Sequence, residues 1–144
     1  MLNRSTLFCL LLTASTSIVL RAAEVNGRWR TQDGQSIIQI STDATGHLQG
    51  RIVQGPQPDE KDLKNPKPEL RQRSLLGLVI LRDFVPSSPL KWKDGHIYDP
   101  DSGNDYKALL WFTEGEPNRL RVKGYVGISL LGRTEVWNRE SGSK

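Results

Sequence analysis

The strictest alternation in the chain occurs in RLRVKGYV, residues 119–126. Apolar or small residues occupy every second position there, and charged or polar residues occupy the positions between them. One face would carry Leu120, Val122, Gly124 and Val126. A period of two gives a β-strand one face toward water and one toward a core, so the segment predicts a half-buried strand.

Seven other segments also have the composition of strands, and turn residues separate most of them. They cover residues 27–31, 36–42, 48–54, 75–84, 95–98, 106–112 and 133–138. The segment 75–84 is almost wholly apolar, and its Gly77 and adjacent Val79 and Ile80 favour strand over helix. Eight strands with mostly short connections predict an all-β fold, an eight-stranded up-and-down antiparallel barrel. A β-sandwich is the structural alternative.

The first 23 residues have the layout of a secretory signal peptide. A short basic start at Arg4 precedes the apolar run 5–20, and Arg21-Ala22-Ala23 leads into polar sequence. The run is short for a membrane span, which takes about 20 residues. We expect cleavage near Ala23, a periplasmic or secreted product and no transmembrane segment after cleavage, with an uncleaved anchor as the alternative. Cys9 lacks the preceding small residues of a lipoprotein site.

Charge and cysteine content limit the class of partner. The chain has 20 basic and 16 acidic residues. Removing Arg4 and Arg21 with the signal leaves 18 against 16, a net charge of +2. Such a balance gives no electrostatic reason to expect nucleic acid as a partner. The only cysteine also leaves with the signal, so one domain over 24–140, followed by a disordered tail over 141–144, must be held together by core packing.

One connection, Gln54–Ser74, is much longer than the others. It holds four of the eight prolines, five basic residues and four acidic residues. Loops of this length are usually functional or disordered. Lys64, Arg71 and Arg73 are candidates to receive an anionic group if the loop folds over a barrel mouth. The alternative is a solvated loop of weak ion pairs, and Asn65 before Pro66 also fits turn chemistry.

Two short motifs mark the ends of the expected barrel. Gly27-x-Trp29 opens the domain, and Trp137-x-Arg139 ends its last strand. The first and last strands of a closed barrel are neighbours, so the Arg139 guanidinium can stack on the Trp29 ring and close one end. The alternative is that these residues are unrelated. At these two places the sequence resembles lipocalins and the wider calycin barrels.

A second resemblance covers nearly the whole mature chain. Its motifs are DLKNPKPELRQR (62–73), LG (76–77), GHIYDP (95–100), SG (102–103), Tyr106, RVKGYVG (121–127) and GRTEVW (132–137). Together they resemble the bacterial family known as domain of unknown function 2147. The resemblance implies a secreted envelope protein with a lipocalin-like barrel. The family has no established activity, so the resemblance leaves the ligand open.

No motif in the sequence indicates catalysis or a metal. The run 99–105 is acidic, but Asn104 and Leu110 stand where a calcium loop needs Gly and Glu, so we expect a hairpin turn. His47 and His96 lack partners at metal-ligand spacing. We therefore expect a binding protein without cofactor or metal, rather than an enzyme.

The expected ligand is a small amphipathic or anionic molecule inside the barrel, with Gln54–Ser74 as a lid. Besides the loop residues, Tyr98 and Tyr106 are candidates to line such a cavity. The alternative function is an envelope protein-interaction module with a packed barrel and no ligand. The sequence does not decide the oligomeric state.

Overall fold

The structure, a computed structural model, describes residues 24–142. The predicted signal peptide and the last two residues of the expected tail lie outside this range. The elements are β1 (Gly27–Arg30), β2 (Ile37–Thr42), β3 (Leu48–Gln54), the 3-10 helix η1 (Pro68–Leu70), β4 (Val79–Ser88), β5 (Lys91–Asp99), β6 (Asn104–Phe112), β7 (Arg119–Tyr125), the 3-10 helix η2 (Ser129–Leu131) and β8 (Arg133–Arg139).

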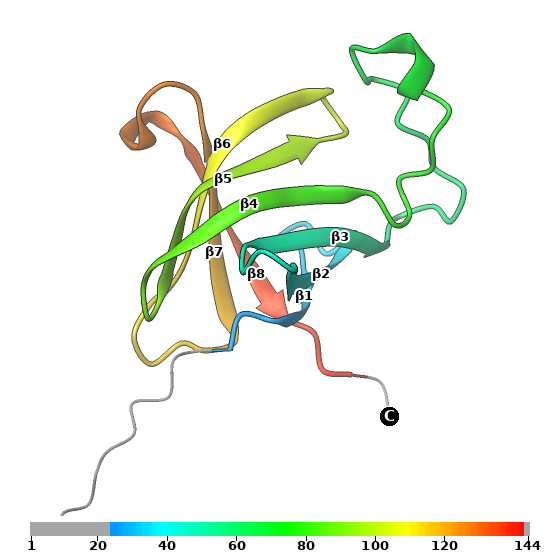
Figure 1. Cartoon of the computed structure of the whole chain (residues 1–144). Coiled ribbons are helices and arrows are strands. Elements are labelled where there is room, and N and C mark those ends of the chain that lie inside the picture. Colours follow the sequence, from blue (N-terminus) through cyan, green and yellow to red (C-terminus); the bar gives the residue numbers. More distant parts are fainter. Residues whose placement is uncertain (1–23, 143–144) are drawn as a thin grey trace, which may run out of the picture.

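The eight strands form one closed antiparallel barrel (Figure 1). Each strand pairs with the next in sequence, and β1 closes the ring by pairing with β8, with Trp29 opposite Arg139 and Arg30 opposite Asn138. The predicted fold class, an eight-stranded up-and-down antiparallel barrel, is confirmed, and the β-sandwich alternative is excluded. The sheet has no free edge because every strand has two neighbours.

Alternation along the strands places the core inside the ring. In β3, Leu48, Gly50 and Ile52 are buried while Arg51 is exposed, as the sequence pattern predicts. In β2 the alternation breaks, because a register shift between Ile37 and Ile38 allows two consecutive isoleucines to be buried. The predicted inward position of Val126 is wrong. The strand β7 ends at Tyr125, and Val126 is 72% exposed in the following loop.

The hairpin β4–β5 differs most from the sequence prediction. The segment 75–78 belongs to the loop, where the Gly77 amide donates to the Ile52 carbonyl, while β4 runs on through Pro86 to Ser88. The strand β5 is correspondingly longer than the predicted 95–98. Asp83 and Asp94 have positive φ angles of 66° and 59°, at the place where the regular pairing of the two strands is interrupted.

The interior is packed at one end of the barrel. There the Phe112 ring lies 5.6 Å from the Trp29 ring and 6.0 Å from the Trp92 ring, measured between centroids. Buried aliphatic side chains such as Leu110 and Leu120 complete this half of the core. Within residues 24–142, no helix combines the length and hydropathy needed to cross a bilayer.

Candidate functional site

The packed end is closed by a stack of Arg139 on Trp29. The Arg139 Cζ atom lies 4.2 Å from the centre of the Trp29 ring, so the predicted stacking is present. The guanidinium also donates to the Asn118 side chain and to the carbonyls of Glu24 and Pro117. These contacts hold the β6–β7 turn and the start of β1 together, so this group closes the barrel.

Gly27 and Trp137, the other residues of the two end motifs, also contribute to closing this end of the barrel. A Cβ atom added at Gly27 would lie 3.2 Å from Arg139 Nη1, so glycine leaves room for the guanidinium. Trp137 is 2% exposed, and its indole nitrogen donates to Glu135 at 3.0 Å. Trp29 donates to the Val25 carbonyl at 2.9 Å. All four residues expected to be structural lie in or beside the wall of the barrel.

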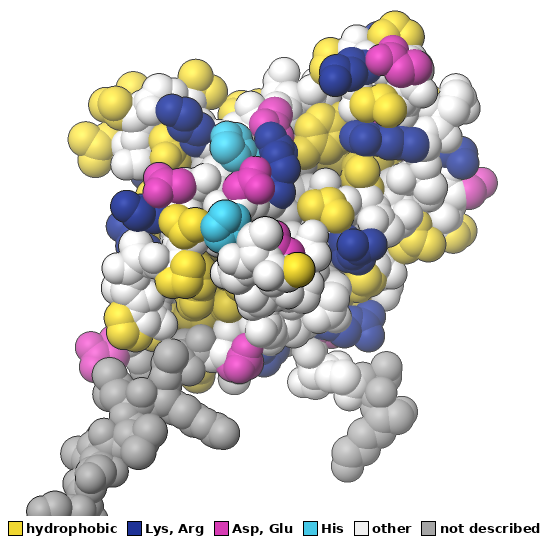
Figure 2. All heavy atoms as spheres, in the orientation of Figure 1, with side chains coloured by type: hydrophobic (Ala, Val, Ile, Leu, Met, Phe, Trp, Pro, Cys, Tyr) yellow, Lys and Arg dark blue, Asp and Glu magenta, His cyan; other side chains and the backbone are white. Residues whose placement is uncertain are grey.

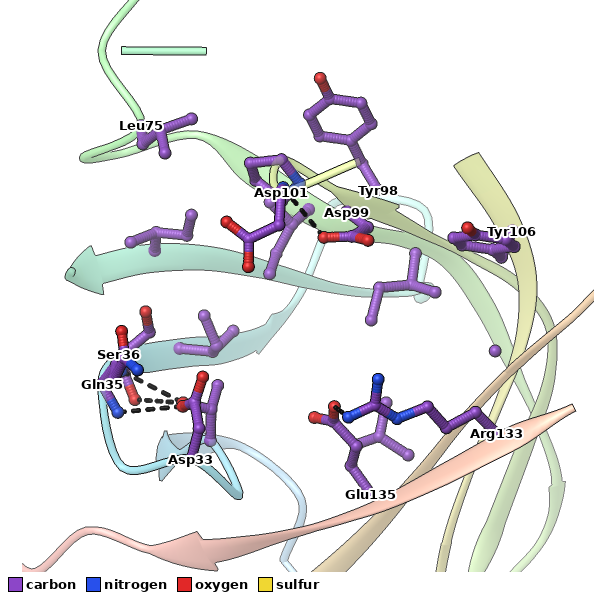
Figure 3. A pocket seen from close by; sticks show the side chains of 18 of the residues that line it. Asp33, Gln35, Ser36, Leu75, Tyr98, Asp99, Asp101, Tyr106, Arg133 and Glu135 are labelled. Carbon is purple, nitrogen blue, oxygen red and sulfur yellow. Dashed lines mark hydrogen bonds and ion pairs between the residues drawn. The ribbon is translucent and has the colours of Figure 1, made fainter. Parts of the chain in front are cut away.

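The opposite end of the barrel carries a cavity, although Ile38, Ile52, Ile80 and Val122 of its lining are only 0–6% exposed and also belong to the core. A cavity of about 650 Å³ opens where the connections β1–β2, β3–β4, β5–β6 and β7–β8 meet (Figure 3). Its apolar lining comes from side chains on five strands, Ile38, Ile52, Ile80, Ile97 and Val122. Gly124 also lines it, and the missing side chain at that position widens the space. The barrel therefore forms a cup with a closed base and an open mouth.

The mouth of the cup is acidic. Five carboxylates line the cavity, those of Asp33, Glu60, Asp99, Asp101 and Glu135, and one guanidinium, that of Arg133. In Figure 3 the Asp101 and Glu135 side chains face the same space from opposite walls. Arg133 lies 3.2 Å from Glu135, so the one cation of the lining is paired.

Asp33 is held in its place at the mouth by its own turn. Its carboxylate accepts hydrogen bonds from the Gln35 amide at 3.0 Å and from the Thr31 hydroxyl at 2.7 Å. These bonds, the amide first, lower the pKa of the Asp33 carboxyl. The group is therefore negatively charged at neutral pH and contributes to the acidity of the mouth.

Three tyrosines from three strands also line the cavity. They are Tyr98 of β5, Tyr106 of β6 and Tyr125 of β7. Tyr98 and Tyr106 were expected there from the sequence. The Tyr98 hydroxyl points away from the cavity (Figure 3) and donates to Asp62 Oδ1 at 2.5 Å. Burial raises the pKa of Tyr98, and the hydrogen bond to Asp62 raises it further.

The long loop does not act as the expected lid. It extends from the barrel beside the hairpin β5–β6 (Figure 1), and within Gln54–Ser74 only Pro56 and Glu60 line the cavity. The cations predicted to receive a ligand lie elsewhere. Arg73 pairs with Asp62 at 2.8 Å, Arg71 donates to the Asn65 carbonyl, and Lys64 is exposed.

A buried carboxylate of the loop explains why Arg73 pairs within the chain instead of lining the cavity. Asp62 has no exposed surface, and a buried charge requires ionic and hydrogen-bonding partners. Arg73, Tyr98 and the Asn65 amide supply them. Asn65 Oδ1 accepts from the Lys67 amide at 2.9 Å, which is the turn chemistry expected before Pro66.

A shallower depression of about 480 Å³ lies outside the barrel, between the loop and the strands β4 to β6. Asn65 and Arg73 line it together with Arg82. Arg82 makes two hydrogen bonds to Asp105, at 2.7 and 2.6 Å, and Arg73 is engaged by Asp62. These guanidinium groups are committed to carboxylates of the chain itself.

The structure shows no metal centre in the part of the chain that it describes. No group of three or more His, Cys, Asp or Glu side chains within 24–142 is arranged to hold a metal ion. His47 and His96 are absent from the cavity lining. The Asp99 carboxylate accepts from the Asp101 amide and the Ser102 hydroxyl, so the run 99–105 forms a hairpin turn.

Sequence reasoning missed the carboxylates of the mouth. They come from separate turns and strand ends that are far apart in the sequence, and Asp99 and Asp101 were interpreted only as parts of a hairpin turn. The predicted barrel topology could have indicated that these carboxylates lie together. In an up-and-down barrel every second connection lies at the same end, so the connection carrying Asp33 and the connection carrying Asp99 and Asp101 must meet.

A closed eight-stranded barrel with one plugged end and one open cup defines this chain as a lipocalin-like protein. The solved structure of HP1028 from Helicobacter pylori, described as belonging to the lipocalin family, is similar to it. The TM-score is 0.73 at 25% sequence identity, and the match covers 83% of this chain and 84% of that chain.

A family model gives the finer assignment. The model described as an uncharacterized protein conserved in bacteria, DUF2147, matches residues 27–139. The chain therefore belongs to this family, as its motifs predicted. No curated protein matches the chain at a significant level.

Proposed function

We propose that this protein binds a small amphipathic molecule in the open half of the barrel. The observation that carries the proposal is the cavity of about 650 Å³, which lies within the usual range of about 300–1,000 Å³ for small-molecule sites. The walls are largely apolar and the mouth is polar. An amphipathic guest satisfies both regions, because its apolar part removes surface from water while its polar part remains at the mouth.

The lining favours one of the two ligand classes that the sequence suggested. An anionic ligand would require unpaired cations at the mouth, but Lys64, Arg71 and Arg73 do not line the cavity and Arg133 is paired with Glu135. The amphipathic part of the expectation is kept, and the anionic part is not supported.

Filling the cavity tests the proposal. Ile97 is half-buried and lines the cavity, so Ile97→Trp places a large ring in the space. We expect the variant to bind the neutral amphiphile decyl maltoside at least about tenfold more weakly by calorimetry, a loss of about 1.4 kcal/mol. Val85→Trp is the matched control, because Val85 is half-buried and lies outside the lining. Equal affinities of both variants and the original chain would contradict the site.

A natural guest can be sought in the protein itself. Native mass spectrometry of protein purified from the cell envelope should show a mass above that of the chain alone, and organic extraction should release the difference. The Ile97→Trp protein should carry less of it. If the original protein carries nothing and takes up nothing from a lipid extract, the proposal is rejected.

We propose a periplasmic or secreted location and a role in binding rather than catalysis. The location is supported by the signal-peptide layout of residues 1–23. Mass spectrometry of the periplasmic fraction should find a mature chain beginning near Glu24. For catalysis, the cheapest check is a hydrolase screen, in which no activity should depend on His96 or Asp62.

A second candidate function is docking on another envelope protein, and one observation favours it. The loop between β7 and β8 exposes four large apolar side chains, Val126, Ile128, Leu130 and Leu131, which are 60–83% exposed (Figure 2). Crosslinking in intact cells should then capture one reproducible partner. The crosslink should disappear when Ile128 and Leu130, which lie outside the cavity lining, are replaced by serine, and it should persist in the Ile97→Trp variant.

A further inference from the structure

We propose that the guest of the cavity carries a positive charge, an amine or a quaternary ammonium group on an apolar chain. This inference rests on the proposed binding function and names the ligand class for the same site. Three features of the mouth support it, namely its charge, the placement of the loop cations and its tyrosine rings. The apolar end of the guest would lie against Ile38 and Val122, and the cationic end would lie at the mouth.

The charge of the mouth is opposite in sign to that of the chain. Five carboxylates and one guanidinium line the cavity, which gives a formal charge of −4, while the whole chain carries +4. The carboxylates come from the connection β1–β2, the long loop, the end of β5 with the turn after it, and β8, where Glu135 lies opposite Val122. Four separate segments thus bring negative charge to one opening, and a cleft lined by one sign of charge attracts ligands of the opposite sign.

Two guanidinium groups on neighbouring elements are engaged outside the cavity. Arg73 compensates the buried Asp62, and Arg82 pairs with Asp105 on the outside of the barrel. Arg133 is paired with Glu135 and also helps to lower the pKa of Asp33, so five carboxylates of the lining share one guanidinium. A cationic guest would supply the missing countercharge.

The aromatic lining favours the same ligand class. Tyr106 and Tyr125 come from the adjacent strands β6 and β7, and both line the cavity, whereas the Tyr98 ring faces Arg73, whose Cζ lies 5.7 Å from the ring centre. The face of an aromatic ring attracts cations, and grouped rings are suited to alkylated ammonium groups that hydrogen-bond poorly. Rings and carboxylates together thus match a cation attached to an apolar chain better than a sugar or a carboxylate head group.

Three amphiphiles with the same decyl chain allow the effect of head-group charge on affinity to be measured separately from the effect of apolar burial. They are decyltrimethylammonium, decyl maltoside and decyl sulfate, each titrated by calorimetry below its micelle concentration in low salt. The full mature chain should bind the cationic probe about tenfold or more tightly than the anionic probe, with the neutral probe between them. Added salt should reduce the difference, because it screens charges at a solvated mouth.

Variants that remove charge test whether the preference for the cationic probe arises at the mouth of the cavity. In the double variant Asp99→Asn with Asp101→Asn, the ratio of cationic to anionic affinity should fall about fivefold or more. Asparagine retains the Oδ1 acceptor that holds the turn at residue 99, so the hairpin should survive. Glu114→Gln is the matched control. It also removes an exposed carboxylate, but from the turn β6–β7 at the closed end, so it should leave the ratio unchanged.

The outcomes distinguish this inference from the proposed function. If the neutral probe binds but the anionic probe binds as well as or better than the cationic probe, the charge inference is overturned and the binding function stands. The same holds if the double variant and Glu114→Gln change the ratio equally. If none of the three probes binds, both proposals are rejected.

Discussion

At the scale of single residues, the buried Asp62 determines where the long loop lies. Its carboxylate is fully buried and receives hydrogen bonds from Tyr98, Asn65 and Arg73. A Cβ atom added at Gly103, whose φ is +74°, would overlap the Lys64 carbonyl. The loop is therefore fixed to the hairpin β5–β6 by one ionic cluster and one close backbone contact, rather than by an apolar core of its own.

We expect Asp62→Ala to loosen the loop. The change leaves Arg73 and the Tyr98 hydroxyl without their common acceptor, so the free energy of unfolding in urea should fall by about 2–4 kcal/mol. Trypsin should also cut the native protein faster after Lys61 and Lys64. Asp59→Ala, an exposed carboxylate of the same loop, is the control and should change either quantity little.

Arg139 provides a second prediction at this scale. Arg139→Ala removes the stack on Trp29 and the bonds that link the β6–β7 turn to the start of β1. Unfolding should become easier by about 1–3 kcal/mol. Arg139→Lys should recover only part of the loss, because an ammonium lacks the planar fork. Full recovery by lysine in thermal denaturation would show that charge alone accounts for the effect.

At the scale of elements, the hairpin β4–β5 is shaped by one aromatic ring packed against one glycine. Gly95 is buried, and a Cβ atom added there would overlap the Phe84 ring. Asp83 and Asp94, which precede these two residues, have positive φ angles. The pairing of the strands is interrupted so that Phe84 can enter the core, and only glycine leaves enough space opposite it.

Gly95→Ala should therefore be strongly destabilising. We expect a loss of about 2–4 kcal/mol in urea unfolding, because the methyl group must displace a fully buried ring. Gly55→Ala, at a loop glycine where an added Cβ meets nothing closer than 3.8 Å, is the control and should change little. Adding Phe84→Leu should make Gly95→Ala less costly. If the double variant instead loses the sum of both single effects, the clash is not the cause.

At the scale of the whole molecule, charged side chains are distributed differently on the outer surface and around the cavity. On the outer surface acids are paired with bases, such as Asp105 with Arg82, Glu116 with Arg121 and Glu140 with Arg30. Around the cavity, acids outnumber bases. The outer pairs favour the folded chain, whereas the carboxylates of the cavity lining exceed the basic groups beside them in number.

The outer pairs predict a loss of stability in acid. Hydrogen bonds from Arg82, Arg121 and Arg30 lower the pKa of Asp105, Glu116 and Glu140 respectively. Lowered folded-state pKa values contribute stability that is present above the ordinary pKa of these groups and is lost as the pH falls through the folded value.

The melting temperature should therefore fall as the pH decreases from about 5 to about 2. The comparison with Asp105→Asn tests the assignment. This variant should start from a lower melting temperature at neutral pH and should lose less of it in acid. An identical acid slope in both proteins would mean that Asp105 does not contribute.

The sequence by itself predicted the number of strands and their order, and it favoured a closed ring over a β-sandwich. Alternation in segments such as 119–126 and short polar turns act locally, and each strand pairs with its neighbour in sequence, so local patterns were sufficient. Trp29 and Arg139 could be paired from the sequence for the same reason, because an up-and-down barrel must join its first strand to its last. The family motifs led to the same fold.

Only the tertiary structure decided which half of the barrel is filled and where the charges lie. Side chains from five strands together determine whether the space beside Ile38 is filled by an aromatic ring or left open. No local sequence pattern specifies this combination. The cations of Gln54–Ser74 appeared available to a ligand in the sequence, but Asp62 becomes buried on folding and captures Arg73. The acidic mouth formed instead from Asp33, Asp99 and Glu135, because barrel closure brings distant turns to the same end.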